Sequence, residues 1–391
     1  MIAPAEALAR LLALAKPVDI ETVPLRDARH RFLAVPVVAR RTQPSRHLSA
    51  MDGYAVRTAD QAGPWRVVGQ SAAGAPFDCS VGPSETVRIF TGAAIPDGAD
   101  IVIVQEDVTR AGDRLKRNNE ASDTSTLHIR RAGSDFTTGQ ILIDAGEPLT
   151  AARIGLAAMG GQARVAVRRR IRIAIISTGN ELVPIDAEPA PDRLPSSNAV
   201  MLGAMLGDLP VDVTDLGIIP DDRIALAAAF EGAADFDVIV STGGASVGDH
   251  DLVQPALLDA GAAIDFWRIA MRPGKPMMAG RLGKAIVLGL PGNPVSAFVT
   301  ATLFLKPLIA HLSGARSPEP RTICVRLAAD MPAVGSRSDY VRAQWSDGAI
   351  MPLDGDSGML VPLAAAQALI VRAAGSPRAA KGHDVEAIML T

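Results

Sequence analysis

Charged side chains and glycines gather in segments that directly follow apolar, strand-like runs. These segments are Ser177-Thr-Gly-Asn-Glu181, the stretch from Ser241 to Asp251, Met271-Arg-Pro-Gly-Lys-Pro276 and Leu290-Pro-Gly-Asn-Pro294. Glycine lets a backbone approach a ligand, and helix N-termini with successive N–H groups favour anions. A single such segment is equally well explained as a turn between a strand and a helix. Four of them together favour a ligand site.

Three cations, Arg268, Arg272 and Lys275, lie around one of these segments. Arginine offers a planar fork to an oxyanion, and lysine a point charge. A solvated basic rim is the alternative, but the Pro-Gly turn between Arg272 and Lys275 rigidifies both and favours a phosphate or oxyanion site.

Acids lie on the neighbouring segments: Glu181, Asp221, Asp249 and Asp251. Carboxylates beside an anion site are costly unless a cation lies between them, and oxygen ligands suit Mg²⁺. The sequence therefore predicts a Mg²⁺ site. Asp221 or Asp222 could instead only cap a helix, an alternative that is weaker for Glu181 and Asp251.

Two familiar phosphate-binding motifs are excluded. Gly243 and Gly248 have the spacing of a Walker A loop, but Asp249 and His250 replace its Lys and Ser/Thr. The first strand is followed by Thr-Gly-Asn-Glu and not by a three-glycine dinucleotide fingerprint. Neither an NTPase nor an NAD enzyme is favoured.

The elements that must position these residues alternate between strand and helix. Apolar runs predict strands at 171–177, 211–217, 236–241, 264–270 and 285–290, with helices at 197–205, 222–234, 252–260 and 295–312. Ser197 or Asn198 is expected to cap the first helix, and Asn293 with Pro294 to begin the last. This alternation predicts an α/β domain whose mostly parallel sheet binds ligands at the carboxyl ends of its strands.

The rest of the chain divides into three further parts. We expect residues 1–44 with 140–169 to form an N-terminal helical and linking domain, 45–139 a small β-rich module, 170–314 the α/β domain and 315–391 a β-barrel-like domain. Short strands are predicted at 65–69, 85–90 and 100–105, and a helix at 151–159.

Composition narrows the function. The chain has 391 residues, 39 basic against 42 acidic, which argues against nucleic-acid or membrane binding. Two cysteines suggest neither a disulfide scaffold nor a Cys-rich zinc site. The uncharged stretch 285–305 contains Pro291-Gly-Asn-Pro294, which disfavours a membrane span, and the N-terminus lacks a basic leader. A cytoplasmic protein is expected.

Six segments together resemble the molybdopterin molybdotransferases, the family of bacterial MoeA and the gephyrin E domain. They are SAMDGYAV (49–56), TGAAIPDGADIVIVQED (91–107), STGNEL (177–182), STGGASVGDHD (241–251), MRPGKP (271–276) and GLPGNPVSA (289–297). The resemblance implies a homodimer of four-domain subunits with a molybdopterin-binding α/β domain. The implied reaction inserts molybdate into adenylylated molybdopterin with Mg²⁺ and releases AMP and molybdenum cofactor.

The resemblance also implies roles for particular residues. Mg²⁺ would be bound by Glu181, Asp221 and Asp251. The catalytic residues would be Asp52, Glu181, Asp251, Arg272 and Lys275. The β-rich module of the other subunit would contribute Asp52, Thr91 and Asp135 to the site. The substrate-binding candidates are Thr91, Asp135, Thr178, Gly179, Ser241, Gly243, Gly244, Ser246, Asp249, Arg268, Pro291, Gly292, Asn293, Ser296, Arg337, Arg342 and Ser357.

One residue departs from the family, and two other functions compete. Arg272 stands where many members have Lys, which keeps the positive charge but puts a bulkier, bidentate group at the position implied for molybdate. A molybdopterin adenylyltransferase is the closest enzymatic rival, although the stand-alone enzymes lack the module and the C-terminal domain. The second competing function is that of a non-catalytic, gephyrin-like dimeric scaffold. An adenylyltransferase and apo-molybdoenzymes are candidate partners in transferring the cofactor.

Overall fold

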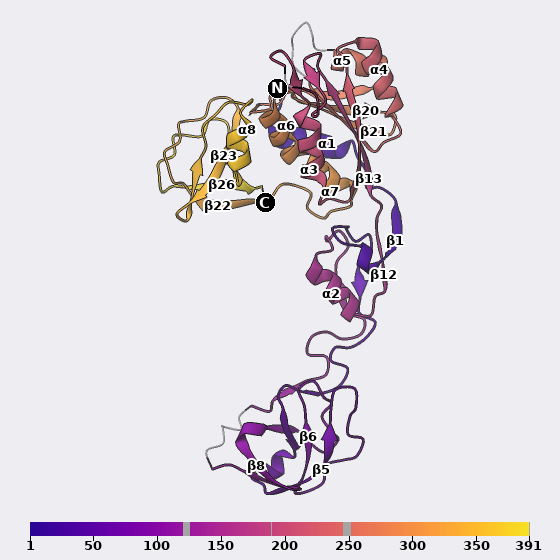
Figure 1. Ribbon diagram of the computed structural model, residues 1–391, viewed down its shortest axis with the longest axis vertical. Coiled ribbons are helices and arrows are strands. Elements are labelled where there is room, and N and C mark those ends of the chain that lie inside the picture. Colours follow the sequence, from indigo (N-terminus) through magenta and orange to yellow (C-terminus); the bar gives the residue numbers. More distant parts are fainter. Residues whose placement is uncertain (120–125, 189, 245–251, 391) are drawn as a thin grey trace.

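The computed structural model describes residues 1–119, 126–188, 190–244 and 252–390. The molecule is elongated (Figure 1). An α/β domain and a C-terminal β domain lie together at one end, a β-rich module lies at the other, and a thin arm joins them.

The α/β domain is built on a six-stranded sheet in the order β16-β13-β17-β21-β20-β18. The first four strands are parallel, and β20 is antiparallel to both of its neighbours. The strands are β13 (Ile171–Thr178), β16 (Val211–Ile219), β17 (Val238–Thr242), β18 (Ala263–Trp267), β20 (Met278–Leu282) and β21 (Ala285–Leu290). The expected mostly parallel sheet is confirmed, but β20 was not predicted.

Helices cover both faces of this sheet because its strands are apolar on both sides. Ile171, Ile173 and Ile175 face α3, α6 and α7, whereas Ala174 and Ile176 face α4 and α5. The helices are α3 (Ser197–Leu206), α4 (Arg223–Gly232), α5 (Val253–Asp259), α6 (Pro294–Thr300) and α7 (Lys306–Leu312). A short pair, β14 (Leu182–Val183) and β15 (Leu194–Pro195), precedes α3.

Three of the expected helix starts can be compared with the structure. Asp222 caps α4 by accepting from the Ala225 N–H at 2.8 Å, so of the two candidate caps it is Asp222 that does this. The cap position of α3 is Ser196, and the expectation of Ser197 or Asn198 was wrong by one residue or two. Asn293 and Pro294 do begin α6, although the Asn293 side chain makes no cap bond.

The last helix is continuous from Pro294 to Leu312 but contains a π-helical turn at Ala301–Leu305. Pro307 has no N–H to donate to the preceding turn, which disfavours regular α-helical bonding there. Among the described residues this one helix is long and apolar enough to cross a membrane, and 78% of its apolar window is buried in the protein.

The first helix, α1 (Pro4–Ala13), packs with the α/β domain. Its Ala7 and Leu11 are fully buried in that domain's core, and Arg10 pairs with Asp265 of β18 at 2.9 Å. We expected residues 1–44 to form a single unit with 140–169, and α1 departs from that grouping because its apolar stripe is covered by α7.

The arm consists of residues 18–44 and 140–169, which run out and back beside each other. β1 (Ile20–Pro24) pairs with β12 (Arg164–Arg168), and β2 (Val37–Val38) pairs with β11 (Ile141–Ile143). The helix α2 (Ala151–Met159) has the predicted bounds, and Thr150 caps it.

The β-rich module contains a six-stranded sheet in the order β7-β4-β6-β5-β9-β8. The strands are β4 (Gly53–Val56), β5 (Trp65–Ser71), β6 (Glu85–Ile89), β7 (Ile101–Val104), β8 (Val108–Ala111) and β9 (Arg114–Arg117). β3 (Leu48–Ser49) and β10 (Ile129–Arg130) pair where the module meets the arm. The three predicted strands of this module are confirmed.

The C-terminal domain is a nearly closed β structure, as expected. Its sheet order is β19-β23-β25-β26-β22, and β24 also pairs with β23. A bridge between Leu327 and Ile350 brings the end of β22 to β24 and closes the barrel. The elements are β22 (Thr322–Arg326), β23 (Ser338–Ser346), β24 (Ala349–Pro352), α8 (Leu360–Ala365), β25 (Ala368–Arg372) and β26 (Asp384–Met389). The remaining strand, β19 (Met271–Arg272), comes from the α/β domain.

Candidate active site at a sheet edge and a domain border

The loops after β13, β17 and β21 meet in close backbone contact. The Gly243 N–H donates to the Leu290 carbonyl at 3.3 Å, and a Cβ on Gly243 would lie 2.2 Å from the Thr178 carbonyl oxygen. A Cβ on Gly292 would lie 3.4 Å from the Gly243 Cα. Because no larger residue fits at Gly243, whose φ is +98°, glycine is required for the three loops to converge.

Asp221 ties the loop after β16 to the loop after β13. One carboxylate oxygen accepts from the Thr178 hydroxyl at 2.7 Å and the other from the Asn180 N–H at 3.1 Å. The Asn180 side-chain oxygen in turn accepts from the Asp221 N–H at 3.1 Å. Asp221 therefore organises this edge through both of its oxygens.

Glu181 turns back over Gly179. A Cβ on Gly179 would lie 2.7 Å from either carboxylate oxygen of Glu181, and Gly179 has a φ of +150°. The Glu181 side chain is exposed. Nearby on β17, the Ser241 hydroxyl is fully buried and has no hydrogen-bond partner among the described residues. Among the described residues, this edge thus carries an exposed carboxylate on the loop after β13 and an unsatisfied hydroxyl on β17.

The segment after β21 joins the α/β domain to the C-terminal domain. Asn198 donates to the Gly292 carbonyl at 2.7 Å, and Asn293 donates to the Ser357 hydroxyl at 3.0 Å. The Val295 N–H donates to the Ser357 carbonyl at 3.1 Å. Ser296, one turn into α6, is buried. Ser357 is therefore held against the sheet edge, and its part in binding substrate stays a prediction.

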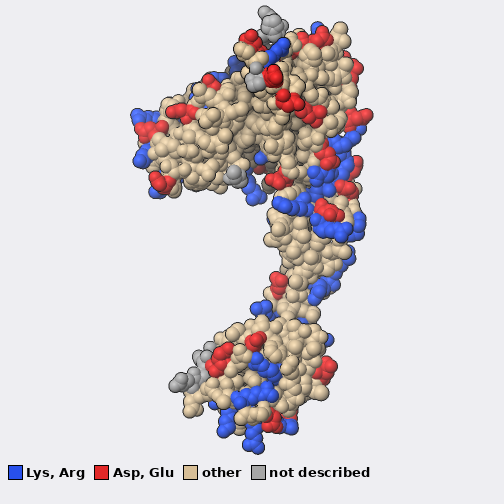
Figure 2. Space-filling view, in the orientation of Figure 1, with Lys and Arg blue, Asp and Glu red and all other residues tan. Residues whose placement is uncertain are grey.

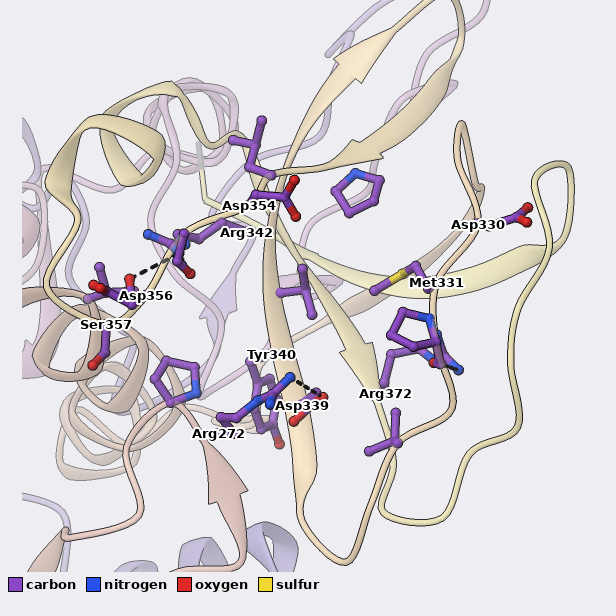
Figure 3. A pocket seen from close by; sticks show the side chains of 18 residues that line it. Arg272, Asp330, Met331, Asp339, Tyr340, Arg342, Asp354, Asp356, Ser357 and Arg372 are labelled. Carbon is purple, nitrogen blue, oxygen red and sulfur yellow. Dashed lines mark hydrogen bonds and ion pairs between the residues drawn. The ribbon is translucent and has the colours of Figure 1, made fainter.

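A cavity of about 640 Å³ opens beside this contact, at the border of the two domains (Figure 3). Arg272 and Ser357 both line it. Arg272 pairs with Asp339, Nη2 to Oδ2, at 3.0 Å, because β19 runs beside β23 in the register that places these two residues opposite each other. Sequence reasoning missed Asp339, whose only signal was its place in an alternating strand two residues after Arg337.

Arg342 also lines the cavity, but its donors are directed elsewhere. Its guanidinium donates to the carbonyls of Met359 at 2.9 Å, Asp356 at 3.1 Å and Gly355. Burial lowers the pKa of Arg342 by more than the nearby Asp356 charge raises it. We expected Arg342 to contact an oxyanion. In the structure it holds the 354–359 loop that carries Ser357.

The other cations lie at the same border. The Arg268 guanidinium covers the Trp267 ring at 4.6 Å, and its buried Nε has no partner among the described residues. Lys275 is exposed, and Arg337 is half-buried. The segment that carries Arg268 is fixed by the N-terminus, since the Ala270 N–H donates to the Ile2 carbonyl at 2.8 Å.

Asp52 and Thr91 form a compact unit in the β-rich module. One Asp52 carboxylate oxygen accepts from the Thr91 N–H at 2.7 Å and from the Thr91 hydroxyl at 2.8 Å. These bonds, with the charge of Arg88, lower the pKa of Asp52. Asp135 is exposed, and its N–H donates to the Gln43 carbonyl at the start of the arm.

The module residues are not brought to the sheet edge of their own chain. Figure 1 places β5, β6 and β8 at the opposite end of the molecule from β13 and β20. Figure 2 shows Lys and Arg side chains gathered on the module and along the arm. Within one subunit, Asp52 and Glu181 therefore lie apart.

Three expected site residues, Ser246, Asp249 and Asp251, lie outside the described residues. Among the residues described, no group of three or more His, Cys, Asp or Glu side chains could hold a metal. The expected Mg²⁺ site therefore remains a prediction. Of its described members, Glu181 has an exposed carboxylate with no hydrogen bond to another described residue, and oxygen is the ligand that Mg²⁺ prefers.

Three family models match almost the whole chain. The MoeA N-terminal region (domain I and II) matches residues 2–161, a probable molybdopterin binding domain matches 174–311, and the MoeA C-terminal region (domain IV) matches 324–390.

Relatives and solved structures agree with these matches. The molybdopterin molybdenumtransferase of Haemophilus influenzae is 38% identical over 301 residues, covering 76% of this chain and 74% of that protein. The enzyme of that name from Nostoc is 34% identical over 395 residues, covering 95% and 89%. The crystal structure of the molybdopterin biosynthesis moeA protein from Pyrococcus horikoshii has a TM-score of 0.85 at 25% identity, covering 100% of both chains.

Proposed function

The chain belongs to the MoeA family of molybdopterin molybdenumtransferases, and we propose that it works as a homodimer in which the module of one subunit completes the sheet-edge site of the other. It inserts molybdenum into molybdopterin during molybdenum cofactor biosynthesis. The observation behind the proposal is that Asp52 and Thr91 form an ordered unit far from the α/β domain of their own chain.

The substrate in this proposal is adenylylated molybdopterin, and the leaving group is AMP. The loops that converge at Gly243 and Gly292 would bind the pterin and its phosphates, because glycine lets a ligand reach backbone N–H groups. Arg272 and Ser357 line the adjoining cavity, which has room for molybdate.

Glu181 would hold Mg²⁺ against the phosphates, together with Asp251 and with Asp221 at the rear of the site. The metal would neutralise phosphate charge. Asp221 has both of its oxygens occupied by Thr178 and Asn180, so its main part is to keep the loop of Glu181 in place. We place the reaction in the cytoplasm.

Reconstitution tests this function directly. Purified protein is mixed with adenylylated molybdopterin, molybdate and Mg²⁺, and both AMP release and activation of an apo-molybdoenzyme are measured. We expect Mg²⁺-dependent AMP release. The proposal fails if AMP is not released, or if it is released at the same rate after Mg²⁺ has been chelated.

Glu181→Gln removes the charge that would hold the metal while keeping the shape of the side chain. Loss of a charged transition-state contact typically lowers a rate by about 10²- to 10³-fold, so AMP release should fall on that scale and require more Mg²⁺. Glu188→Gln is the matched control, since Glu188 is an exposed acid seven residues further on. An unchanged Mg²⁺ requirement in Glu181→Gln would place the metal elsewhere.

A further inference from the structure

Arg88 makes an unusual set of contacts beside the Asp52 turn of the module. It lies on β6 directly opposite Tyr54 of β4. Its guanidinium carbon is 5.1 Å from the centre of the Tyr54 ring and 4.9 Å from that of Phe90. A cation stacked on two aromatic rings is held in one orientation.

The same guanidinium donates to two acceptors on either side of Asp52. Nη1 donates to the Gly53 carbonyl at 3.0 Å, and Nη2 donates to the Gln105 side-chain oxygen at 2.5 Å. The Gln105 N–H in turn donates to the Asp52 carbonyl at 3.1 Å. Arg88 thus fixes the backbone that follows Asp52 and the residue that holds the Asp52 carbonyl.

Arg88 also supports the partner of the Asp52 carboxylate. Phe90, on which its guanidinium stacks, directly precedes Thr91, and the N–H and hydroxyl of Thr91 both donate to Asp52. Gly53 cannot be replaced to stiffen the turn, since a Cβ there would lie 2.1 Å from the Ile103 carbonyl oxygen. The Met51–Gly53 turn therefore depends on hydrogen bonds from residues of other strands and loops, such as Arg88 and Gln105.

We propose that Arg88 is a positioning residue that fixes the Met51–Gly53 turn and so aims the Asp52 carboxylate at the substrate. The inference rests on the proposed role of Asp52 in the reaction. Arginine suits this part because its planar fork serves two acceptors while its faces stack on rings, and lysine cannot do both. Its positive charge also contributes, after the two Thr91 bonds, to the lowered pKa of Asp52.

The test compares Arg88→Gln and Arg88→Lys in the full-length protein. A misplaced catalytic group can cost about a hundredfold in rate, so we expect Arg88→Gln to lower AMP release by tenfold or more and Arg88→Lys to lower it less. Arg66→Gln is the matched control, because Arg66 lies on the adjacent strand β5 and pairs with Glu85 on an exposed surface. It should leave AMP release unchanged.

Two measurements separate positioning from a general structural role. In a ¹³C-carboxyl NMR titration, with the Asp52 signal assigned by its loss in Asp52→Asn, Arg88→Gln should raise the pKa of Asp52, since a neighbouring positive charge is removed. In the Asp52→Asn background, Arg88→Gln should cost little further AMP release, because residues that act through one another are not additive.

An unchanged Asp52 pKa in Arg88→Gln would overturn the inference. So would a loss of AMP release of equal size in the wild-type and Asp52→Asn backgrounds. If Asp52→Asn alone keeps full activity, it is the proposed role of Asp52 that fails, and the NMR titration still reports whether Arg88 fixes the turn.

Discussion

At the scale of single residues, Arg272 of the α/β domain is held by Asp339, which belongs to a strand of the C-terminal domain. The identity of the site residues could be predicted more readily than partners of this kind. The loops carrying Thr178, Glu181 and Asn293 were identified from glycine and proline next to charged residues after strands. Asp339 and Arg88 were missed because their importance comes from pairing across strands that are far apart in sequence. Register of this kind is not visible in one sequence.

The pair of Arg272 and Asp339 leads to a prediction for molybdate. Arg272→Ala removes one charge-assisted donor, worth roughly 1.5–3 kcal/mol, so half-saturation by molybdate should rise by about 10- to 100-fold. Arg272→Lys should retain much of the activity, since lysine keeps the charge. The measurement is a molybdate titration of cofactor formation at saturating adenylylated molybdopterin.

Arg281→Ala serves as the control for this titration, because Arg281 is exposed on β20 and does not line the cavity. If Arg272→Ala titrates like wild type, the oxyanion is held by other groups, with Arg337 the next candidate. Asp339→Asn should not raise half-saturation, since it frees Arg272 from its ion pair.

At the scale of elements, the spacing of apolar residues and the glycines, prolines and capping residues at their ends predicted most helices and strands of the α/β domain. The remaining elements depend on tertiary pairing. α2 has its predicted bounds because Thr150 caps it and Gly160 ends it. β20 was missed because it is a short antiparallel strand between two parallel-running ones, and the Met271–Pro276 turn obscured its start. The placement of α1 depends on long-range packing that periodicity cannot show.

α1 should stabilise the α/β domain and not the arm. Leu11 is fully buried in the α/β core, and Leu→Ala at such a site typically costs about 2–5 kcal/mol. We expect Leu11→Ala to speed hydrogen exchange in β13 and β17 and to leave the β-rich module unaffected. Glu6→Ala, on the exposed side of α1, is the control. Faster exchange in the module or the arm instead would contradict this assignment.

At the scale of the whole molecule, the pattern of strands and helices predicted the α/β, β-rich and C-terminal parts, but neither the place of α1 nor the arrangement of the parts. Nothing in the sequence shows that a thin arm holds the module away from the α/β domain, or that β19 crosses into the C-terminal sheet. In the proposed homodimer, this separation is the reason that a complete site needs the module of a second subunit.

Shared sites predict complementation between inactive chains. In the proposed dimer, Asp52→Asn and Glu181→Gln should each inactivate every site of their own homodimer. In a mixed dimer one site has lost both groups and the other has lost neither, so about half of the wild-type activity per mixed dimer should return. Mixed dimers purified with two different affinity tags provide the measurement. Mixed dimers that are verified by mass and inactive would show that each site uses residues of one chain.

The two chain segments of the arm, 18–44 and 140–169, have a consequence for the gene as well as for the protein. Where they enter the module, the Thr42 and Thr138 hydroxyl oxygens are 3.1 Å apart, and Gln43 bridges to Phe136. A segment whose ends lie this close can be exchanged as a unit without rerouting the rest of the chain. Exchanging the segment between Thr42 and Thr138 with that of a relative would therefore transfer Asp52, Thr91 and Arg88 together.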